Sequence, residues 1–285
     1  MPLKNAKLSI MTNALHYGTG IFGGIKIFET DEGLAIFRLD DHLKRLEAGV
    51  KALDFNFKVD RTKLKKIIMS LAAKNQVKGT VYVRPLIYRS DTDLSPDIAG
   101  NYDIAIYILH MPYYFDPSKG LKVSVSSWRR NPSDSIPPRT KATGGYINSA
   151  LAIHEAHKRG FDSAIMLDKN GYVSEGAVMN IFIVKNSKLI TPPLDSDILE
   201  GITRKTVIEM ARALNIDVTE RQINEQELYQ ADEVFFSGTA AEITWCNTIE
   251  SVEISSEAGP ITKRLNLQFK SLASSRPDLF TPLKG

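Results

Sequence analysis

A lysine and a tyrosine bracket a short glycine turn in RTKATGGY, residues 139–146. Lys141 precedes the turn, Tyr146 closes it, and the helical pattern over 147–159 ends at Gly160. A lysine held at the mouth of a pocket loses its charge more easily and becomes an amine nucleophile, including for Schiff bases. The chain contains 36 lysines and arginines, so Lys141 by itself is more readily explained as an ordinary lysine without a catalytic role.

Two short segments of small residues could bind an anion. Gly201-Ile202-Thr203 opens a helical pattern, and backbone N–H groups at a helix start bind phosphate readily. Gly238-Thr239-Ala240 follows an apolar strand and offers N–H groups together with a hydroxyl. An ordinary helix start and a tight turn explain the same residues equally well.

A carboxylate, Glu175, follows the strand pattern after Asn170-Gly171, a dipeptide typical of a hairpin turn. Glu175 could pair with a buried cation or cap a turn at the surface, which is the commoner case. Gly18-x-Gly20-x-x-Gly23 has the glycine spacing of a dinucleotide-binding loop, but a strand pattern follows it where that motif requires a helix. His154 and His157 lie three residues apart without an obvious third ligand, so no metal site is expected.

The composition indicates a globular protein without unusual features. Hydrophobic residues make up 43% of the 285 residues, and the net charge of +3 is too small to indicate a nucleic-acid partner. The single cysteine, Cys246, excludes an internal disulfide framework and suits a reducing compartment. The first residues lack a signal-peptide core, and the longest apolar runs, such as 104–109, fall far short of the roughly 20 residues of a membrane span. A cytoplasmic protein with no membrane partner is expected.

Helical and strand patterns are mixed in both halves of the chain, which favours two α+β domains over one doubly wound parallel sheet. We expect a small domain over 1–112, a Pro- and Tyr-containing linker over 113–121 and a large domain over 122–285. The first half predicts strands at 21–30, 34–37, 80–88 and 102–109, with helices at 41–53, capped by Asp40, and 61–75. The second half predicts strands at 121–128, 164–167, 172–174, 180–184, 188–190 and 234–237, with helices at 147–159, 202–214 and 260–272.

A lysine, two anion-binding turns, an arginine on a helix and a carboxylate on a hairpin are the parts that a pyridoxal phosphate site needs. The sequence resembles the branched-chain amino acid aminotransferases, which belong to the fold-type IV pyridoxal phosphate enzymes. The resemblance covers nearly the whole chain and is carried by these blocks: ALHYGTGIF (14–22), FRLDDHLKRL (37–46), VYVRPLIY (81–88), SSWRR (126–130), KATGGY (141–146), LDKNGYVSEGAVMNIF (167–182), LEGITR (199–204), LYQADEVFFSGTAAEIT (228–244) and GPITKRL (259–265).

The resemblance implies two mixed α/β domains with the cofactor, pyridoxal 5'-phosphate, at the domain interface. It also implies ping-pong transamination of leucine, isoleucine and valine with 2-oxoglutarate, giving branched-chain 2-oxo acids and glutamate. Amino acids and 2-oxo acids would be the small-molecule partners. The enzyme would be a homodimer or a larger assembly built from dimers.

The same resemblance implies the cofactor contacts. Lys141 would form the internal aldimine and, once freed, carry the proton between the substrate Cα and C4′ of the cofactor. Glu175 would face the pyridine nitrogen and keep it protonated, and Tyr146 would hydrogen-bond the phenolic oxygen. The residues that would hold the phosphate or pack on the ring are Arg45, Ile202, Thr203, Thr239 and, on the ring face, Leu199.

The implied substrate contacts come from both halves of the chain. Tyr82 and the turn at Thr239 and Ala240 would bind the α-carboxylate. Arg84 would take the distal carboxylate of glutamate. The side-chain pocket would be lined by Phe22 and Tyr17, and Tyr17 could be supplied by the partner subunit.

The sequence departs from the family pattern mainly near the substrate. Gly23 stands where the family usually has Glu, and Lys26 where it often has Arg. Residues 91–100 lack the Gly-Met-Gly-type segment of many relatives, Val178-Met179 replaces a frequent Gly-Glu, and Glu200 replaces a frequent Pro. These departures leave open a transaminase of D-amino acids or (R)-amines. Two further alternatives are an aminodeoxychorismate-lyase-type enzyme in which Lys141 expels pyruvate, and a non-catalytic dinucleotide- or small-molecule-binding protein.

Overall fold

The chain forms two compact units in the structure, a computed structural model that describes residues 1–111 and 113–283. The N-terminal unit comprises Met1–Pro112, Thr140–Gly145 and Arg276–Gly285, and the C-terminal unit comprises Tyr113–Arg139 and Tyr146–Ser275. The sequence prediction had placed 140–145 and 276–285 in the second domain. They belong to the first unit because β15 pairs with β3, and because the Thr143 N–H donates to the Gly20 carbonyl at 2.8 Å.

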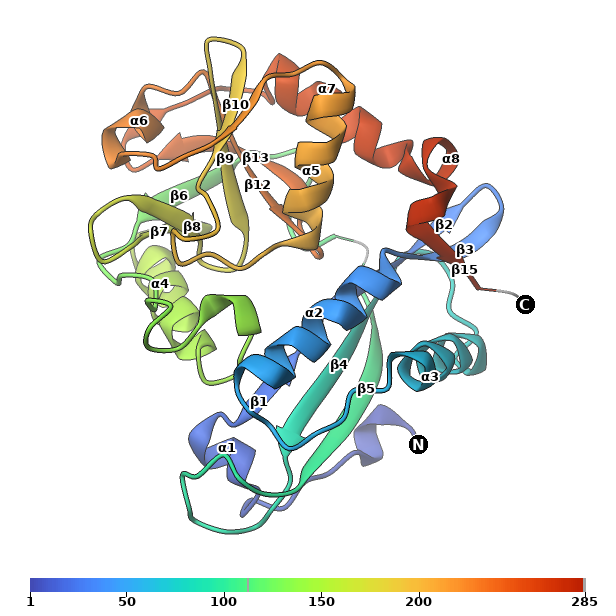
Figure 1. The fold of residues 1–285 in the computed structure, drawn as a ribbon. Helices are drawn as coiled ribbons and strands as arrows, with labels where there is room; N and C mark the ends of the chain where they lie inside the picture. Colours follow the sequence, from blue (N-terminus) through green and yellow to red (C-terminus); the bar gives the residue numbers. More distant parts are fainter. Residues whose placement is uncertain (112, 284–285) are drawn as a thin grey trace. The chain divides into compact units, whose positions relative to one another are not determined.

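The N-terminal unit contains a six-stranded sheet in the order β1-β4-β2-β3-β15, with β5 also paired to β4 (Figure 1). Its elements are η1 (Leu3–Asn5), α1 (Asn13–Tyr17), β1 (Gly20–Phe22), β2 (Ile25–Thr30), β3 (Gly33–Phe37), α2 (Leu39–Ala52), α3 (Arg61–Lys74), β4 (Val81–Arg89), β5 (Tyr102–His110), η3 (Pro277–Leu279) and β15 (Phe280–Pro282).

The strand predicted over 21–30 is in fact two strands, β1 and β2, which pair one after the other with β4. The break falls at Gly23 and Gly24. A Cβ on Gly23 would lie 2.8 Å from Pro85 Cγ, and a Cβ on Gly24 would lie 1.9 Å from the Tyr82 hydroxyl oxygen. Pro85 also lacks the N–H that a continuous ladder would use.

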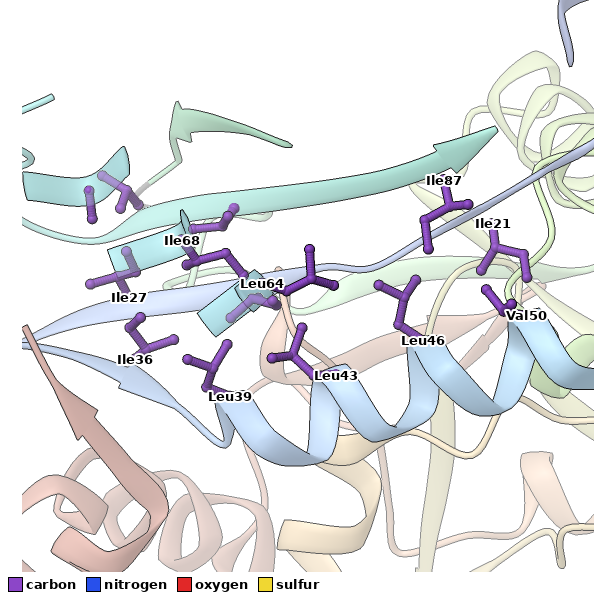
Figure 2. Close-up of a cluster of buried hydrophobic side chains, with 14 of the residues drawn as sticks. Ile21, Ile27, Ile36, Leu39, Leu43, Leu46, Val50, Leu64, Ile68 and Ile87 are labelled. Atoms are coloured by element: carbon purple, nitrogen blue, oxygen red, sulfur yellow. The ribbon is translucent and has the colours of Figure 1, made fainter. Parts of the chain in front are cut away.

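Helix α2 covers one face of this sheet and buries a stripe of aliphatic side chains. Figure 2 shows Leu39, Leu43, Leu46 and Val50 of α2 pointing toward isoleucines of the sheet, and all four are 3% exposed or less. Full burial of such a side chain stabilises the fold by about 1.5–3 kcal/mol. The predicted cap, Asp40, is wrong: the helix begins at Leu39, and Asp40 lies in its first turn.

The C-terminal unit is built on a nine-stranded sheet in the order β11-β10-β9-β12-β13-β6-β7-β8, with β14 also paired to β13. Its elements are β6 (Leu121–Val125), α4 (Tyr146–Lys158), β7 (Ser163–Leu167), β8 (Val173–Gly176), β9 (Asn180–Lys185), β10 (Lys188–Thr191), α5 (Ile202–Ala213), β11 (Val218–Glu220), α6 (Glu225–Tyr229), β12 (Glu233–Gly238), β13 (Glu242–Ile249), β14 (Val252–Glu253), α7 (Pro260–Lys270) and α8 (Leu272–Ser275). A short 3-10 turn, η2 (Pro138–Thr140), leads to the lysine segment.

Both predicted hairpins of this unit form. β7 and β8 pair around Asn170-Gly171. β9 and β10 pair around Asn186 and Ser187, and these two residues adopt positive φ. The strands β8 and β9 are almost entirely buried, so the polar side chains that they carry must find partners inside the protein. Across the described part of the chain, no helix is both long and apolar enough to cross a membrane.

Candidate active site

The lysine segment is attached to the N-terminal unit by its backbone. The Phe22 N–H donates to the Lys141 carbonyl at 3.3 Å, and Ala142 forms a bridge with Ile21. Lys141 itself adopts φ +57°, a conformation that costs energy for a residue with a side chain and that recurs at functional sites. The backbone thus fixes where the Lys141 side chain starts, and its Nζ lies 5.0 Å from the centre of the Phe22 ring.

The glycines on both sides of this attachment are required by close packing. Gly18 has φ +64°, and a Cβ there would lie 2.5 Å from the Cα of Gly144. The Gly144 N–H donates to the Gly18 carbonyl at 3.0 Å, and the Thr143 hydroxyl donates to the same oxygen at 2.7 Å. In the Gly18-x-Gly20-x-x-Gly23 motif, Gly18 therefore allows a close backbone contact with Gly144.

Several cations lie around one buried histidine of α2. Burial, followed by the charges of Arg45, Lys141 and Arg38, holds the pKa of His42 well below its usual value. His42 is 3% exposed, and its Nδ1 has no hydrogen-bond partner among the described residues. Arg45 and Lys141 are thus close enough to act on the same group, and the positive potential that they create favours a bound anion.

Tyr82, Arg84 and Phe22 form a second cluster on the same sheet. The Arg84 Nη2 donates to the Tyr82 hydroxyl at 3.1 Å, and its guanidinium carbon lies 4.4 Å from the centre of the Phe22 ring. The Arg84 Nε is buried and has no partner in the described chain, so this arginine has a donor left for a carboxylate. The two clusters share Phe22, whose ring is close to both Lys141 and Arg84.

Two departures from the family pattern lie beside these residues. Gly23 leaves no room for a side chain, because any Cβ would meet the Pro85 ring. Lys26 is 2% exposed, and its Nζ lies 5.3 Å from the centre of the Phe28 ring. A buried lysine next to Tyr82 in the sheet register is an unusual choice, because an ammonium group needs compensation when it leaves water.

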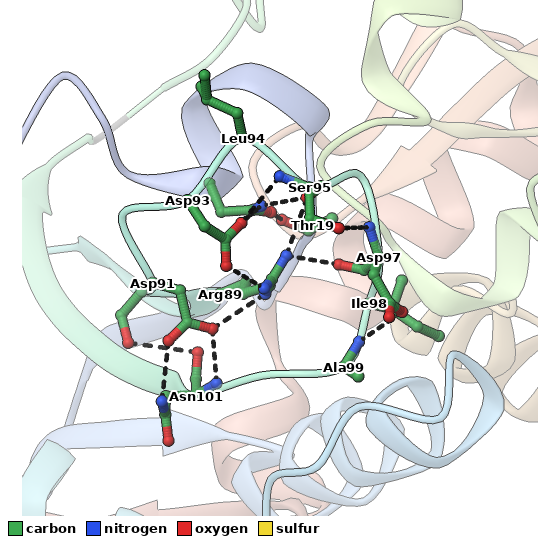
Figure 3. A network of polar contacts seen from close by, with 12 residues as sticks. Thr19, Arg89, Asp91, Asp93, Leu94, Ser95, Asp97, Ile98, Ala99 and Asn101 are labelled. Carbon is green, nitrogen blue, oxygen red and sulfur yellow. Dashed lines mark hydrogen bonds and ion pairs between the residues drawn. The ribbon is translucent and has the colours of Figure 1, made fainter.

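The loop 91–100 is organised by a buried arginine, Arg89, as Figure 3 shows. Its guanidinium donates to the Asp91 and Asp93 carboxylates and to the carbonyls of Ser95 and Asp97. The hydroxyl of Tyr17 donates to the Leu94 carbonyl in this loop at 2.6 Å. The side chain of Tyr17 is 39% exposed and lies against the loop that the sequence comparison had singled out.

In the C-terminal unit, Glu175 is buried on β8 and is hydrogen-bonded at both oxygens. Its Oε1 lies 2.7 Å from Arg130 Nη2, and its Oε2 accepts from Asn180 Nδ2 at 2.8 Å. The Leu199 N–H donates to both oxygens at 3.2 Å. The surface-cap interpretation of Glu175 is therefore wrong, since the carboxylate is 3% exposed and pairs with a buried cation.

Arg130 and Asn180 are the partners that the sequence reasoning did not name. Arg130 ends the block SSWRR and Asn180 stands in VMNIF, so their positions within matching blocks were the available signal. Asn180 also donates to the Leu199 carbonyl at 2.9 Å, and a Cβ on Gly201 would lie 1.9 Å from its side-chain oxygen. This amide therefore connects Glu175 to the start of α5.

Helix α5 begins with Ile202 and Thr203, so the helix start predicted at Gly201 is confirmed. Its N-cap residue, Gly201, makes no side-chain cap hydrogen bond. The first N–H groups of a helix have no partner within the helix, and without a capping side chain they suit a phosphate. Thr203 and Ile202 are both buried, at 4% and 6% exposure.

The remaining predicted residues of this unit are half-buried. Tyr146 is the first residue of α4, and Leu199 precedes α5 with its N–H on Glu175. Thr239 and Ala240 lie in the short connection between β12 and β13. The predicted residues thus form two groups, one in each unit: Tyr17, Phe22, Arg45, Tyr82, Arg84 and Lys141 in the first, and Tyr146, Glu175, Leu199, Ile202, Thr203, Thr239 and Ala240 in the second. No group of side chains suited to a metal ion occurs within 1–111 and 113–283.

Comparisons with known proteins agree with the chemistry of these two groups. The family described as amino-transferase class IV matches residues 20–249, and the chain belongs to this family. A probable branched-chain-amino-acid aminotransferase of Aquifex aeolicus is 45% identical over 270 residues, which cover 93% of this chain and 87% of that protein.

Solved structures show the same similarity. The branched-chain aminotransferase of Thermoproteus uzoniensis with norvaline aligns with a TM-score of 0.95 at 38% identity, covering 99% of this chain and 96% of that one. The branched-chain amino acid aminotransferase of Thermobaculum terrenum in its PLP form aligns with a TM-score of 0.90 at 34% identity, covering 100% and 96% of the two chains. The predicted α+β fold of a class IV aminotransferase is confirmed.

Proposed function

We propose that this protein is a pyridoxal phosphate-dependent aminotransferase that moves the amino group of branched-chain L-amino acids to 2-oxoglutarate. The observation that carries the proposal is the buried carboxylate of Glu175, which has partners at both oxygens and for which neither a surface nor a capping role is left. Relatives with this activity in their names cover nearly the whole chain.

The described residues fit the cofactor. Arg45, the N–H groups of Ile202 and Thr203, and the Thr203 and Thr239 hydroxyls would hold its phosphate. Glu175 would meet its ring nitrogen, Tyr146 its phenolic oxygen and Leu199 one ring face. The unpartnered Nδ1 of His42 and the absence of a side-chain cap at Gly201 are local features that leave room for an anion. When bound, pyridoxal phosphate acts as an electron sink for the charge left on the substrate Cα after its proton is removed.

The protein residues position the substrate and move the proton. The Lys141 Nζ would hold the cofactor at rest and, once released, would accept the α-proton of the substrate and return it to the neighbouring carbon. Tyr82 and the Thr239 and Ala240 N–H groups would orient the α-carboxylate. Phe22 and Tyr17 would pack on an apolar side chain, and Arg84 would bind the distal carboxylate of a dicarboxylic substrate through its unpartnered Nε.

We also propose that one cofactor serves the two groups of residues, since Lys141 and Tyr146 lie only five positions apart along the chain. We further propose a homodimer or an assembly of dimers in the cytoplasm; sedimentation and cell fractionation test these two statements.

Spectral titration of the bound cofactor tests the proposed activity. We expect leucine, isoleucine, valine and glutamate to convert it rapidly to its amino form, with D-amino acids and (R)-amines far slower. No conversion by any of the four L-amino acids would overturn the proposal. Fast conversion by D-alanine or by an (R)-amine would instead indicate the alternative transaminases, and release of pyruvate from aminodeoxychorismate would indicate the lyase.

A further inference from the structure

Arg130 and Glu175 form an ion pair that is almost completely removed from water. Their side chains are 10% and 4% exposed, and Nη2 lies 2.7 Å from Oε1. Desolvation makes such a pair a poor source of stability compared with well-packed apolar residues. Because Glu175 of this pair is the carboxylate assigned to the cofactor, the pair indicates a purpose other than stability.

Arg130 is held in place from two sides. Its N–H donates to the Leu167 carbonyl at 2.8 Å, and its Nη1 donates to the Ser149 hydroxyl of α4 at 3.2 Å. Asn148, also on α4, donates to the Arg129 carbonyl at 2.8 Å and accepts from the Asn131 N–H at 3.2 Å. The guanidinium thus reaches Glu175 from a backbone fixed by both β7 and α4.

The charge of Arg130 decides where a proton resides beside Glu175. The groups facing this carboxylate include the Arg130 guanidinium from the segment after β6, the Asn180 amide from β9 and the Leu199 N–H. A buried carboxyl group without a cation favours its neutral form, because burial penalises the charge. A neutral Glu175 could no longer stabilise a protonated ring nitrogen.

We propose that Arg130 is a positioning residue that keeps Glu175 ionised, so that the proton between this carboxyl group and the ring nitrogen of pyridoxal phosphate stays on the nitrogen. This inference rests on the proposed function for the identity of the cofactor. Arg130 itself acts through Glu175. Lysine cannot fully replace it, because one ammonium group lacks the planar fork that binds Glu175 and Ser149 together.

The first experiment uses the full-length apoprotein and needs no activity. In Arg130→Met, Glu175 binds a proton in the folded state at pH values where the unfolded chain does not, so stability falls as pH rises. The loss of melting temperature relative to wild type should be about 4–8 °C greater at about pH 8 than at about pH 5.5. In Arg130→Met/Glu175→Gln the loss should be independent of pH. An equal loss at both pH values in the single variant would overturn the proposal.

Arg204→Met is the matched control. Arg204 is equally buried, has an unpartnered Nε and lies 2.8 Å from the Glu220 carboxylate, which is 35% exposed. Because water still solvates Glu220, removing its partner should lower the melting temperature without this pH dependence. A pH-dependent loss in the control equal to that of Arg130→Met would mean that the measurement reports any lost arginine, and would overturn the assignment to Glu175.

The second experiment reads the proton directly from the ¹⁵N chemical shift of the ring nitrogen in ¹⁵N-labelled pyridoxal phosphate bound to the full-length protein. Wild type should show the shift of a protonated ring, Arg130→Met a move toward the unprotonated value, and Arg130→Lys a partial return. An unchanged shift in Arg130→Met, with wild type active, would overturn the inference and leave the proposed function intact. If wild type binds no cofactor, the proposed function fails, while the apoprotein experiment still decides whether Arg130 holds the charge of Glu175.

Discussion

Two predicted site residues, Glu175 in the C-terminal unit and Arg84 in the N-terminal unit, differ in how completely their polar atoms are satisfied. In the C-terminal unit, Glu175 has hydrogen bonds or an ion pair at both carboxylate oxygens. In the N-terminal unit, His42 and Arg84 each keep a buried nitrogen without a partner among the described residues, and Lys141 sits on a backbone with positive φ.

This difference matches the tasks that we assign to the two groups. A group that only supplies a fixed charge benefits from a rigid, fully bonded setting, because no reorganisation is then needed during the reaction. Groups that bind and release substrates, or carry a proton, need unused hydrogen-bonding capacity. The comparison predicts that substitutions in the lysine group alter chemistry and substrate choice, whereas those in the carboxylate group alter both chemistry and stability.

The largest effect is expected for Lys141→Ala. Removing the amine that we propose to bind the cofactor and to carry the proton should lower kcat by about 10⁴-fold or more. The visible absorbance of the lysine-bound cofactor, which borohydride bleaches, should disappear, while melting temperature changes little because the side chain is half-buried.

Lys26→Met provides the control for Lys141→Ala, because Lys26 is a second lysine of the same unit and is 2% exposed. The Lys26→Met variant should retain the visible absorbance of the lysine-bound cofactor. Borohydride labelling of Lys26 instead of Lys141, found by peptide mapping, would contradict the assignment.

Glu175→Gln should lower both the catalytic rate and the stability of the protein. Loss of the charge at the ring nitrogen should lower kcat by about 10²–10³-fold. The substitution also leaves Arg130 buried without its counter-ion, which should cost about 3 kcal/mol of unfolding free energy. Steady-state kinetics and urea unfolding measure the two effects, and a variant with full stability would refute the proposed contrast between the units.

Arg84→Met should change substrate choice more than rate. Loss of one charged hydrogen-bond donor should raise KM for glutamate and 2-oxoglutarate about 10- to 100-fold. Leucine conversion should change less than about threefold, because its side chain makes no use of the guanidinium. Arg129→Met, at an exposed arginine, is the control, and equal losses for leucine and glutamate would count against the role of Arg84.

The smallest effect is a pH dependence of stability that His42 contributes. Because the pKa of His42 is lowered by burial and then by Arg45, Lys141 and Arg38, the unfolded chain takes up a proton below about pH 6.5 while the folded protein does not. The wild type should therefore lose about 1 kcal/mol between pH 6.5 and 5.5, and only about 0.4 kcal/mol from this source between pH 8 and 6.5. In His42→Gln this loss of stability at acid pH should vanish. If the unfolding free energies of the two proteins depended on pH in the same way, this contribution of His42 would be excluded.

Local patterns in the sequence predicted most of the secondary structure and supplied the candidate reactive groups, whose roles stay predictions. The hairpin at Asn170-Gly171, the helix start at Gly201 and the helix after Tyr146 depend on residues close to one another along the chain. The break between β1 and β2 was not predictable in this way. It depends on Pro85 and Tyr82, which lie some sixty residues away and leave no room for a Cβ at Gly23 and Gly24.

The sequence alone therefore determined the family, the α+β class and the list of candidate side chains. Only the tertiary structure decided that Glu175 is a buried, paired carboxylate and that Arg130 and Asn180 are its partners. It also decided that residues 140–145 join the N-terminal unit. The physical reason is the same in each case: burial and partners at long sequence separation set the charge and orientation of a side chain, and neither is encoded in the residues next to it.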